Sequence, residues 1–193
     1  MIVLFLILAV VLFIIFRPKY REPQIIRGVL TDEECEYIKS KALKKLKPSR
    51  IGIRKVNDTT YRNSESTGLR LDRDPKLREI MERYTDDISR CEKLHVIRYK
   101  PGGFYNPHSD AFPSDTNHRV HTFIFALNDE YEGGETYFPI LDMSYRLKKG
   151  DVLSFDTLNT WGYIPEEAIH GGATVKSGEK WIANLWLRQT SIA

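Results

Sequence analysis

Residues 94–112 read LHVIRYKPGGFYNPHSDAF, and this stretch holds both a strong strand signal and the most informative polar pair of the chain. Its first six residues are rich in β-branched and aromatic side chains, as is typical of a strand. The two glycines that follow mark a turn. His108 and Asp110 then stand two positions apart. Such a pair also occurs in polar turns without chemical function, so its meaning depends on its surroundings.

Short runs of the same strand-forming type recur through the C-terminal half, separated by turns that contain Gly, Pro and Asp. The predicted strands are residues 94–99, 120–127, 136–138, 151–155 and 181–187. Strands at this spacing indicate a β-sandwich or a jelly roll. No internal repeat and no low-complexity segment accompanies them.

The first of two predicted helices begins with a capping box. The Thr31 hydroxyl and the Glu34 carboxylate can each satisfy a backbone amide that has no partner in the first turn. Apolar residues, among them Cys35, then follow at helical spacing until Pro48 stops the helix. One face of this helix is therefore expected to be buried, and Cys35 to act as a small apolar side chain.

The second predicted helix has Asp74 as its N-cap and proline at its first position, and its apolar face continues to Ile88. Between the two helices, the polar residues 51–71 are interpreted as a mobile hairpin or loop. The predicted fold class is therefore α+β, with a double-stranded β-helix (jelly roll) core and N-terminal supporting helices.

The first sixteen residues, MIVLFLILAVVLFIIF, contain no charge and no cleavage site of small residues. This composition predicts a membrane anchor at residues 1–18, followed by one domain at residues 19–193. A cleaved signal peptide and a buried helix are the alternatives, because a spanning helix usually has about 17–25 apolar residues.

Positive charge is concentrated directly after this hydrophobic segment. Residues 17–55 contain twelve Lys or Arg and five Asp or Glu, a net charge of +7, whereas residues 56–193 carry a net charge of −4. The basic part can rest on anionic headgroups or form a solvated helix face. Nucleic acid is not an expected partner, since the larger acidic part would repel phosphates.

A further histidine, His170, stands in a turn with two glycines before the last strands. Two imidazoles and one carboxylate on one face of an octahedral metal form the facial triad of non-haem Fe(II) oxygenases. Lys180 follows at the start of a strand, where a buried ammonium would require an anion. The alternatives are a polar turn for the pair His108 and Asp110, and a surface position for Lys180.

A series of short motifs gives these residues a context. They are RGVLTDEEC (27–35), RYKPG (98–102), PHSD (107–110), EGGETYFP (132–139), KKGD (148–151), HGG (170–172), GEKW (178–181) and LWL (185–187). In this order they resemble the prolyl 4-hydroxylase branch of the 2-oxoglutarate- and Fe(II)-dependent oxygenases. The resemblance covers residues 27–190 and is closest to the compact single-chain members of plants, algae and large viruses.

The resemblance implies that His108, Asp110 and His170 bind Fe(II), and that Lys180 pairs with the distal carboxylate of 2-oxoglutarate. It also implies a requirement for O2 and ascorbate. The remaining histidines, His95, His118 and His121, are assigned no role, and a core or cavity-lining position is expected for His121.

Three further positions match residues around the cosubstrate in the family. Tyr99 and Thr136 match positions that hydrogen-bond 2-oxoglutarate, and Trp186 matches a tryptophan packed beside it. Ordinary strand packing is the alternative for Thr136 and Trp186.

Substrate contacts are implied by the motif Arg62-Asn-Ser64, which resembles part of a loop that closes over a peptide, and by Arg119, which matches an arginine near the substrate proline. Solvated loop charges are the alternative. Two departures concern the peptide groove: Gly68 stands near a position where relatives often carry an aromatic residue, and Arg188 stands where some carry histidine.

The function implied by the resemblance is hydroxylation of peptidyl proline to 4-hydroxyproline with release of succinate and CO2. The expected substrate is a proline-rich or collagen-like peptide. One alternative is the same chemistry on another residue or on a free amino acid. The other is a non-catalytic, membrane-anchored jelly-roll binding module.

The predicted location is a single-pass membrane protein of the endoplasmic reticulum. Its topology stays open, because the sequon at Asn57 would be usable in the lumen whereas the basic residues after the anchor favour a cytoplasmic domain.

Overall fold

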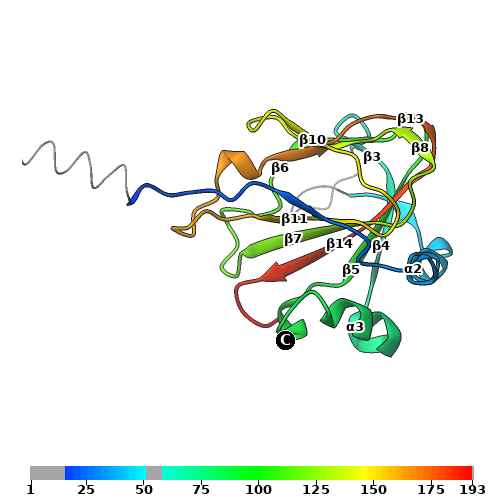
Figure 1. Cartoon of the computed structure of the whole chain (residues 1–193), viewed down its shortest axis with the longest axis horizontal. Helices are drawn as coiled ribbons and strands as arrows, with labels where there is room; N and C mark the ends of the chain where they lie inside the picture. The colour runs from blue at the N-terminus through cyan, green and yellow to red at the C-terminus, as the bar shows by residue number, and fades with distance from the viewer. Residues whose placement is uncertain (1–15, 51–57, 193) are drawn as a thin grey trace, which may run out of the picture.

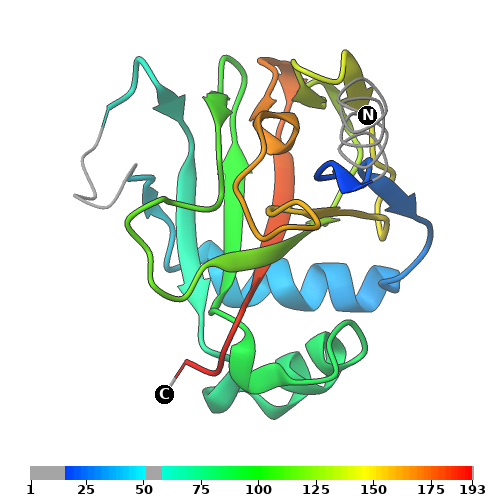
Figure 2. The same ribbon diagram turned by 90° about the vertical axis from the view of Figure 1, so that its left-hand side faces the viewer.

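Two antiparallel sheets face each other in the computed structural model, which describes residues 16–50 and 58–192 (Figures 1 and 2). The larger sheet has seven strands. In spatial order they are β1 (Gln24–Ile26), β11 (Val152–Asp156), β7 (Arg119–Ala126), β14 (Lys180–Arg188), β5 (Leu94–Tyr99), β4 (Glu65–Leu69) and β2 (Lys47–Pro48).

The smaller sheet has five strands, in the order β10 (Met143–Tyr145), β9 (Thr136–Phe138), β12 (His170–Gly172), β6 (Phe104–His108) and β3 (Arg62–Asn63). A separate ribbon pairs β13 (Val175–Gly178) with β8 (Tyr131–Gly133). Two facing sheets supported by a few helices confirm the predicted α+β jelly-roll core.

Both predicted helices form, and they lie on the outer face of the larger sheet (Figure 1). Helix α2 (Asp32–Leu43) begins with the complete Thr31 and Glu34 capping box. Helix α3 (Pro75–Glu82) begins at Asp74, whose carboxylate accepts a hydrogen bond from the Leu77 amide. Short 3-10 turns are η1 (Leu71–Arg73), η2 (Ile88–Arg90) and η3 (Glu166–Ala168).

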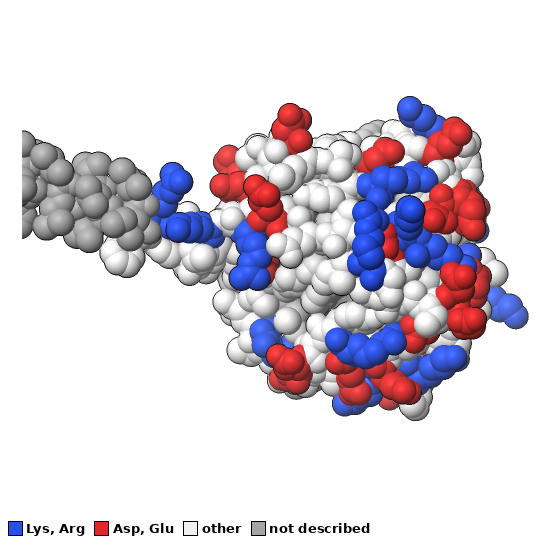
Figure 3. All heavy atoms as spheres, viewed as in Figure 1, with Lys and Arg blue, Asp and Glu red and all other residues white. Residues whose placement is uncertain are grey.

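The alternation of side chains along the strands divides the apolar residues between two cores. On β5, Val96 packs into the core beneath the helices, whereas its neighbour Ile97 packs into the core between the sheets. The core under the helices includes the fully buried Cys35 and Leu77. Away from these cores, Lys and Arg are interspersed with Asp and Glu on the face shown in Figure 3.

Several element boundaries differ from those predicted. Helix α2 ends at Leu43, before Pro48, because residues 47–48 pair with β4 as strand β2. The second helix ends at Glu82, and Ile88 belongs to η2. In the described part of the chain, nine short strands lie outside the predicted ranges, where the sequence has no strong hydrophobic pattern, and their pairing with other strands defines them: β1, β2, β3, β4, β6, β8, β10, β12 and β13.

The predicted loop at residues 51–71 is only partly described, because residues 51–57 lie outside the described residues. The remainder contains two strands that do not pair with each other. Strand β3 pairs with β6 in the smaller sheet, and β4 pairs with β5 in the larger sheet. Ser64 therefore stands where the chain crosses from one sheet to the other, so the hairpin interpretation is corrected here.

The predicted single-pass membrane location is also corrected. Within residues 16–50 and 58–192, no helix is long and apolar enough to cross a bilayer. The hydrophobic residues 1–15, on which the predicted anchor mainly rests, lie outside the described residues.

Asp74 connects the two helices, and we expect Asp74→Ala to lower the free energy of unfolding by about 1–2 kcal/mol. Its carboxylate caps α3, accepts a hydrogen bond from the Tyr37 hydroxyl (2.7 Å) and pairs with Lys41 on α2 (3.2 Å). Urea unfolding with an unchanged m-value would measure the loss. Asp72→Ala is the matched control, because that carboxylate pairs with Arg70 at the surface and little change is expected. An equal loss in both variants would contradict this role of Asp74.

Candidate active site

The two predicted histidine ligands are brought together by strand pairing. His108 ends β6 and His170 begins β12, and the two residues are direct partners in the antiparallel register. Asp110 follows β6 by two residues, and ligand atoms of all three side chains lie within 4.8 Å of one another. Residues 62 positions apart in the chain thus form one cluster, as predicted.

Hydrogen bonds to the backbone fix which nitrogen each histidine presents to the cluster. His108 Nδ1 bonds the Asn106 carbonyl at 2.9 Å, and His170 Nδ1 bonds the Ala168 carbonyl at 3.0 Å. Because a carbonyl only accepts, each Nδ1 carries a proton, and Nε2 is the nitrogen that each ring presents to the cluster. Both Nε2 atoms lie 3.8 Å from a carboxylate oxygen of Asp110.

The Asp110 carboxylate is held by two neutral donors. The Thr122 hydroxyl and the Trp186 indole N–H each donate to Oδ2 at 2.8 Å, which leaves Oδ1 with no protein donor in the described part of the chain. Burial alone would raise the Asp110 pKa, but His170, His108 and the Trp186 bond lower it below its ordinary value. Asp110 is therefore ionised at neutral pH.

This donor set fits a divalent transition metal. Burial lowers the pKa of His108 below its ordinary value, so that imidazole is neutral and ready to bind a cation. Two imidazole nitrogens and one carboxylate oxygen converge, and the Nδ1 bonds supply the outer contacts that usually orient metal-binding histidines. Tyr105 stacks on His108 with 3.6 Å between ring centroids and restricts its rotation.

Lys180 lies deeper in the same cavity. It begins β14 opposite Tyr99 of β5, is 4% exposed, and donates from Nζ to the Gly134 carbonyl at 2.6 Å. Burial lowers the pKa of Lys180 from 10.5 to about 8. No carboxylate of the described residues lies within ion-pair distance of it, although Glu135 acts in the opposite direction to burial on its pKa, and a buried ammonium without a direct counter-ion is costly. The position therefore indicates an anionic ligand.

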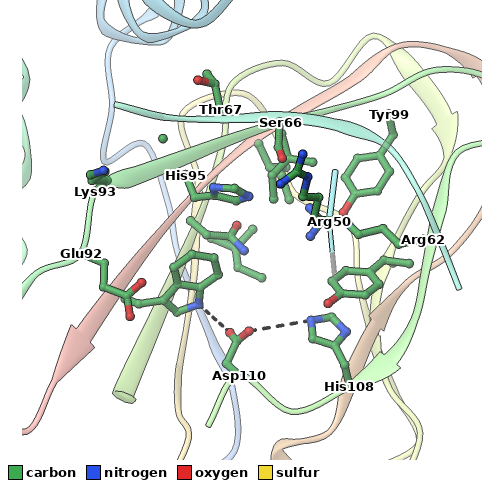
Figure 4. Close-up of a pocket in the computed structure, with 18 of the residues that line it drawn as sticks. Arg50, Arg62, Ser66, Thr67, Glu92, Lys93, His95, Tyr99, His108 and Asp110 are labelled. Carbon is green, nitrogen blue, oxygen red and sulfur yellow. Dashed lines mark hydrogen bonds and ion pairs between the residues drawn. The ribbon is translucent and has the colours of Figure 1, made fainter. Parts of the chain in front are cut away.

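The cavity that contains these groups has a volume of about 1470 Å³. The predicted cosubstrate residues Tyr99, Thr136 and Trp186 all line it, together with Lys180 and the three candidate metal ligands His108, Asp110 and His170, which we call the metal cluster. Figure 4 shows His108 and Asp110 at one side, with Tyr99, Arg62 and His95 around the same space. Burial raises the pKa of Tyr99, so its hydroxyl stays protonated and can donate.

The predicted substrate residues lie in different environments. Arg62 is 7% exposed, stacks on Tyr105 and donates from Nε to Ser64, while its Nη2 atom is buried without a partner in the described residues. Ser64 does not line the cavity and also bonds Ser49. Of this pair, Arg62 alone offers a free group to a ligand.

Arg119 is engaged by its neighbours. It pairs with Glu92 at 2.7 Å and lies over the Trp186 ring at 3.7 Å. It also donates to the backbone carbonyl of Asp110. Arg188 shares Glu92 at 2.8 Å. These contacts support the indole that bonds Asp110, so the packing around Arg119 has a structural purpose.

Some cavity residues had been assigned no role from sequence. His95 was assigned no role, yet it lines the cavity, and its ring lies tilted against that of Trp186 with 5.4 Å between centroids. Asn184 also lines the cavity, and its buried Oδ1 has no partner in the described part of the chain. The period of two along β5 and β14 could have placed both, because they share a strand face with Tyr99 and Trp186 respectively.

His121 was expected in the core or the cavity, and only the cavity position is excluded. It is half-buried, its ring nitrogens bond Asp156 and Ser154 of β11, and its ring centroid lies 4.5 Å from that of Phe123. The neighbouring Thr122 points inward to Asp110 instead.

Comparisons with known proteins agree with this geometry. The family model described as the 2OG-Fe(II) oxygenase superfamily matches residues 94–188. Prolyl 4-hydroxylase 1 of Arabidopsis thaliana is 32% identical over 86% of this chain and 68% of the relative. The prolyl 4-hydroxylase subunit alpha-1 of Rattus norvegicus is 31% identical over 89% of this chain and 35% of the relative.

Among solved structures, the viral collagen prolyl hydroxylase from Paramecium Bursaria Chlorella virus-1, in complex with 2-oxoglutarate, superposes with a TM-score of 0.67. It is 31% identical, and the match covers 88% of this chain and 97% of that one.

The hydrogen bond from Trp186 to Asp110 can be tested by measuring metal affinity. We expect Trp186→Phe to weaken Mn(II) binding by about 10–100-fold, because Asp110 loses the bond that orients its carboxylate. Titration calorimetry with Mn(II) would measure the change. Trp181→Phe is the matched control, since that indole bonds Glu179 away from the cluster. Unchanged Mn(II) affinity in Trp186→Phe would contradict an orienting role for the indole.

Proposed function

Because this chain belongs to the prolyl 4-hydroxylase family of the 2-oxoglutarate- and Fe(II)-dependent oxygenases, we propose that it hydroxylates peptidyl proline to 4-hydroxyproline, with release of succinate and CO2. Fe(II), 2-oxoglutarate and O2 are the cofactor and cosubstrates of this enzyme class, and ascorbate accompanies it. We assign the catalytic domain to residues 19–193.

One observation carries the proposal. Two imidazoles and a carboxylate that can bind a metal ion lie in the same cavity as the buried ammonium of Lys180, which has no direct counter-ion in the described residues. His108, Asp110 and His170 would hold Fe(II) through three ligands and leave the remaining positions to 2-oxoglutarate and O2. When bound, the iron supplies the oxygen activation that breaks an unactivated C–H bond. No acid, base or nucleophile of the protein is required for that step.

The chain's own residues would position the cosubstrate. Lys180 would pair with the distal carboxylate of 2-oxoglutarate, and its bond to Gly134 already directs the ammonium. Tyr99 and Thr136 would donate hydrogen bonds from the cavity wall. The apolar residues Ile124 and Ile182 line the same space and would exclude water from it.

The peptide would enter beside Arg62, whose buried free Nη2 can bond a carbonyl of the substrate. Proline-rich or collagen-like segments suit such a cavity, because they are already extended as polyproline II and lose little conformational entropy on binding. Arg119 is a second candidate for substrate contact, although its guanidinium is paired with Glu92.

The same chemistry on another residue is the second candidate. The metal cluster does not encode which C–H bond is presented, and the polar lining of His95 and Asn184 leaves room for a different side chain. A panel of peptides that differ only at the target residue would distinguish these substrates.

The proposed activity can be measured with the full chain, Fe(II), ascorbate, 2-oxoglutarate and a proline-rich peptide. We expect succinate release together with a gain of one oxygen at proline, detected by mass spectrometry. His108→Ala and Lys180→Ala should each lose about 100-fold or more of the activity, since each removes a group with no substitute. Lys176→Ala on β13 is the control and should retain it. Succinate release with no oxidised peptide would contradict proline as the substrate.

Lys180 should also make cosubstrate binding depend on pH. Below its free-state pKa of about 8 the ammonium is already charged, so the Kd for 2-oxoglutarate should be constant. Above that pH the lysine must take up a proton to pair with the carboxylate, and the Kd should rise by about tenfold per pH unit. Titration of the Mn(II)-loaded protein between about pH 7 and 10 would test this. Lys180→Arg, which does not titrate there, should show a flat profile. A Kd that does not change with pH in the unaltered protein would contradict a pKa of about 8 for Lys180.

A further inference from the structure

The entrance of the cavity is lined by an unusual number of cations. Five of them, which we call the basic rim, surround the edge formed by β2 and β4: Lys44, Lys45, Lys47, Arg50 and Lys93. All five side chains are exposed. They come from separate segments, namely the end of α2, strand β2 with its continuation, and the residue before β5.

The carboxylates at the cavity do not compensate the basic rim. Only Glu92 and Asp110 line the cavity within the described residues. Glu92 is shared by Arg119 and Arg188, and Asp110 belongs to the metal cluster. No rim residue forms an ion pair in residues 16–50 and 58–192. The stretches outside them, residues 1–15, 51–57 and 193, contain no Asp or Glu side chain that could serve.

Ordinary surface chemistry explains only part of this cluster. Lys44 and Lys45 follow the C-terminus of α2, where cations interact favourably with the helix dipole. Lys47 and Lys93 have no such reason. Some lysines elsewhere pair with carboxylates, as Lys149 does with Glu36 at 2.9 Å, whereas others, such as Lys148 and Lys176, form no ion pair in the described residues. The rim differs in that five unpaired cations gather at one cavity, whereas cations and anions are interspersed on the face that Figure 3 shows.

A second observation extends the positive charge inward. Arg62 lies in the same cavity, is more than nine-tenths buried, and has an Nη2 atom without a partner in the described residues. Figure 4 shows Lys93, Arg50 and Arg62 around the space that leads to His108 and Asp110. The basic rim and Arg62 thus line the cavity that leads to His108 and Asp110, and none of these six cations is paired with a carboxylate in the described residues.

The position of the Lys93 side chain is defined by its contact with β4. The side-chain stem of Lys93 lies over Gly68 of β4, at 3.4 Å from the position that a Cβ would take. The Lys93 side chain therefore lies against β4 beside the cavity that it lines.

We propose that the peptide substrate carries Asp or Glu side chains close to the target proline, on the side that faces β2 and β4. This inference rests on the proposed function of the same cavity and specifies its substrate class. Ion pairs at an exposed rim contribute to binding and encounter more than to the chemical step. The preference should therefore appear in Kd and KM rather than in kcat, and it should weaken with salt.

A measurement of peptide binding tests this inference independently of the proposed hydroxylation. Three fluorescent proline-rich peptides that differ only in flanking Glu, Gln or Lys would be titrated with the full chain loaded with Mn(II) and 2-oxoglutarate. At low ionic strength we expect the Glu peptide to bind at least about tenfold more tightly than the Gln peptide, since each exposed pair contributes up to about fivefold. Raising the salt to about 0.3 M should reduce the difference.

Charge-reversal variants test whether the basic rim causes the preference for the Glu peptide. Lys47→Glu with Lys93→Glu should abolish the preference, whereas Lys148→Glu with Lys176→Glu, two exposed lysines outside the cavity, changes net charge equally and should retain it. Equal binding of the Glu and Gln peptides, or the same loss in both double variants, would overturn the proposal. So would tighter binding of a single-stranded oligonucleotide than of the Glu peptide. Hydroxylation is scored separately by the mass shift, so a failure of the chemistry leaves this result interpretable.

Discussion

The antiparallel pairing of β12 with β6 is the constraint on which the rest of the site depends. It sets His170 opposite His108, and the two carbonyls that accept from their Nδ1 atoms belong to the same two chain segments. A slip of one residue in this register would turn one histidine to the opposite face of the sheet. Ligand distance, tautomer and orientation therefore follow from backbone pairing rather than from side-chain packing alone.

The cavity keeps two buried charges of opposite sign from neutralising each other. Asp110 is stabilised by the neutral donors Thr122 and Trp186, and Lys180 by the carbonyl of Gly134. Each ion is thus solvated by dipoles while keeping capacity for a ligand. A direct pair between the two would satisfy both charges and leave little to attract a metal or a carboxylate.

The predictable features of this protein were those encoded by local patterns. The two capped helices and the long strands were identified correctly because periodicity and capping are local. The characteristic order of several motifs pointed to His108, Asp110 and His170, which the fold brings together. The short strands and the crossing at Ser64 depend on partners far along the chain, so no local sequence pattern predicted them. The cavity position of His95 was missed because the assignment ignored the strict alternation of strand faces.

Strand β14 is the last strand in the chain, yet it lies between β7 and β5 in the middle of the larger sheet. During synthesis, β5 and β7 emerge well before the segment that pairs with both of them. Until then each presents an unpaired edge rich in apolar residues, which is a hazard for intermolecular association. Folding of this domain on the ribosome is therefore expected to be delayed until residues 180–188 are released, and chains truncated before them should depend strongly on chaperones.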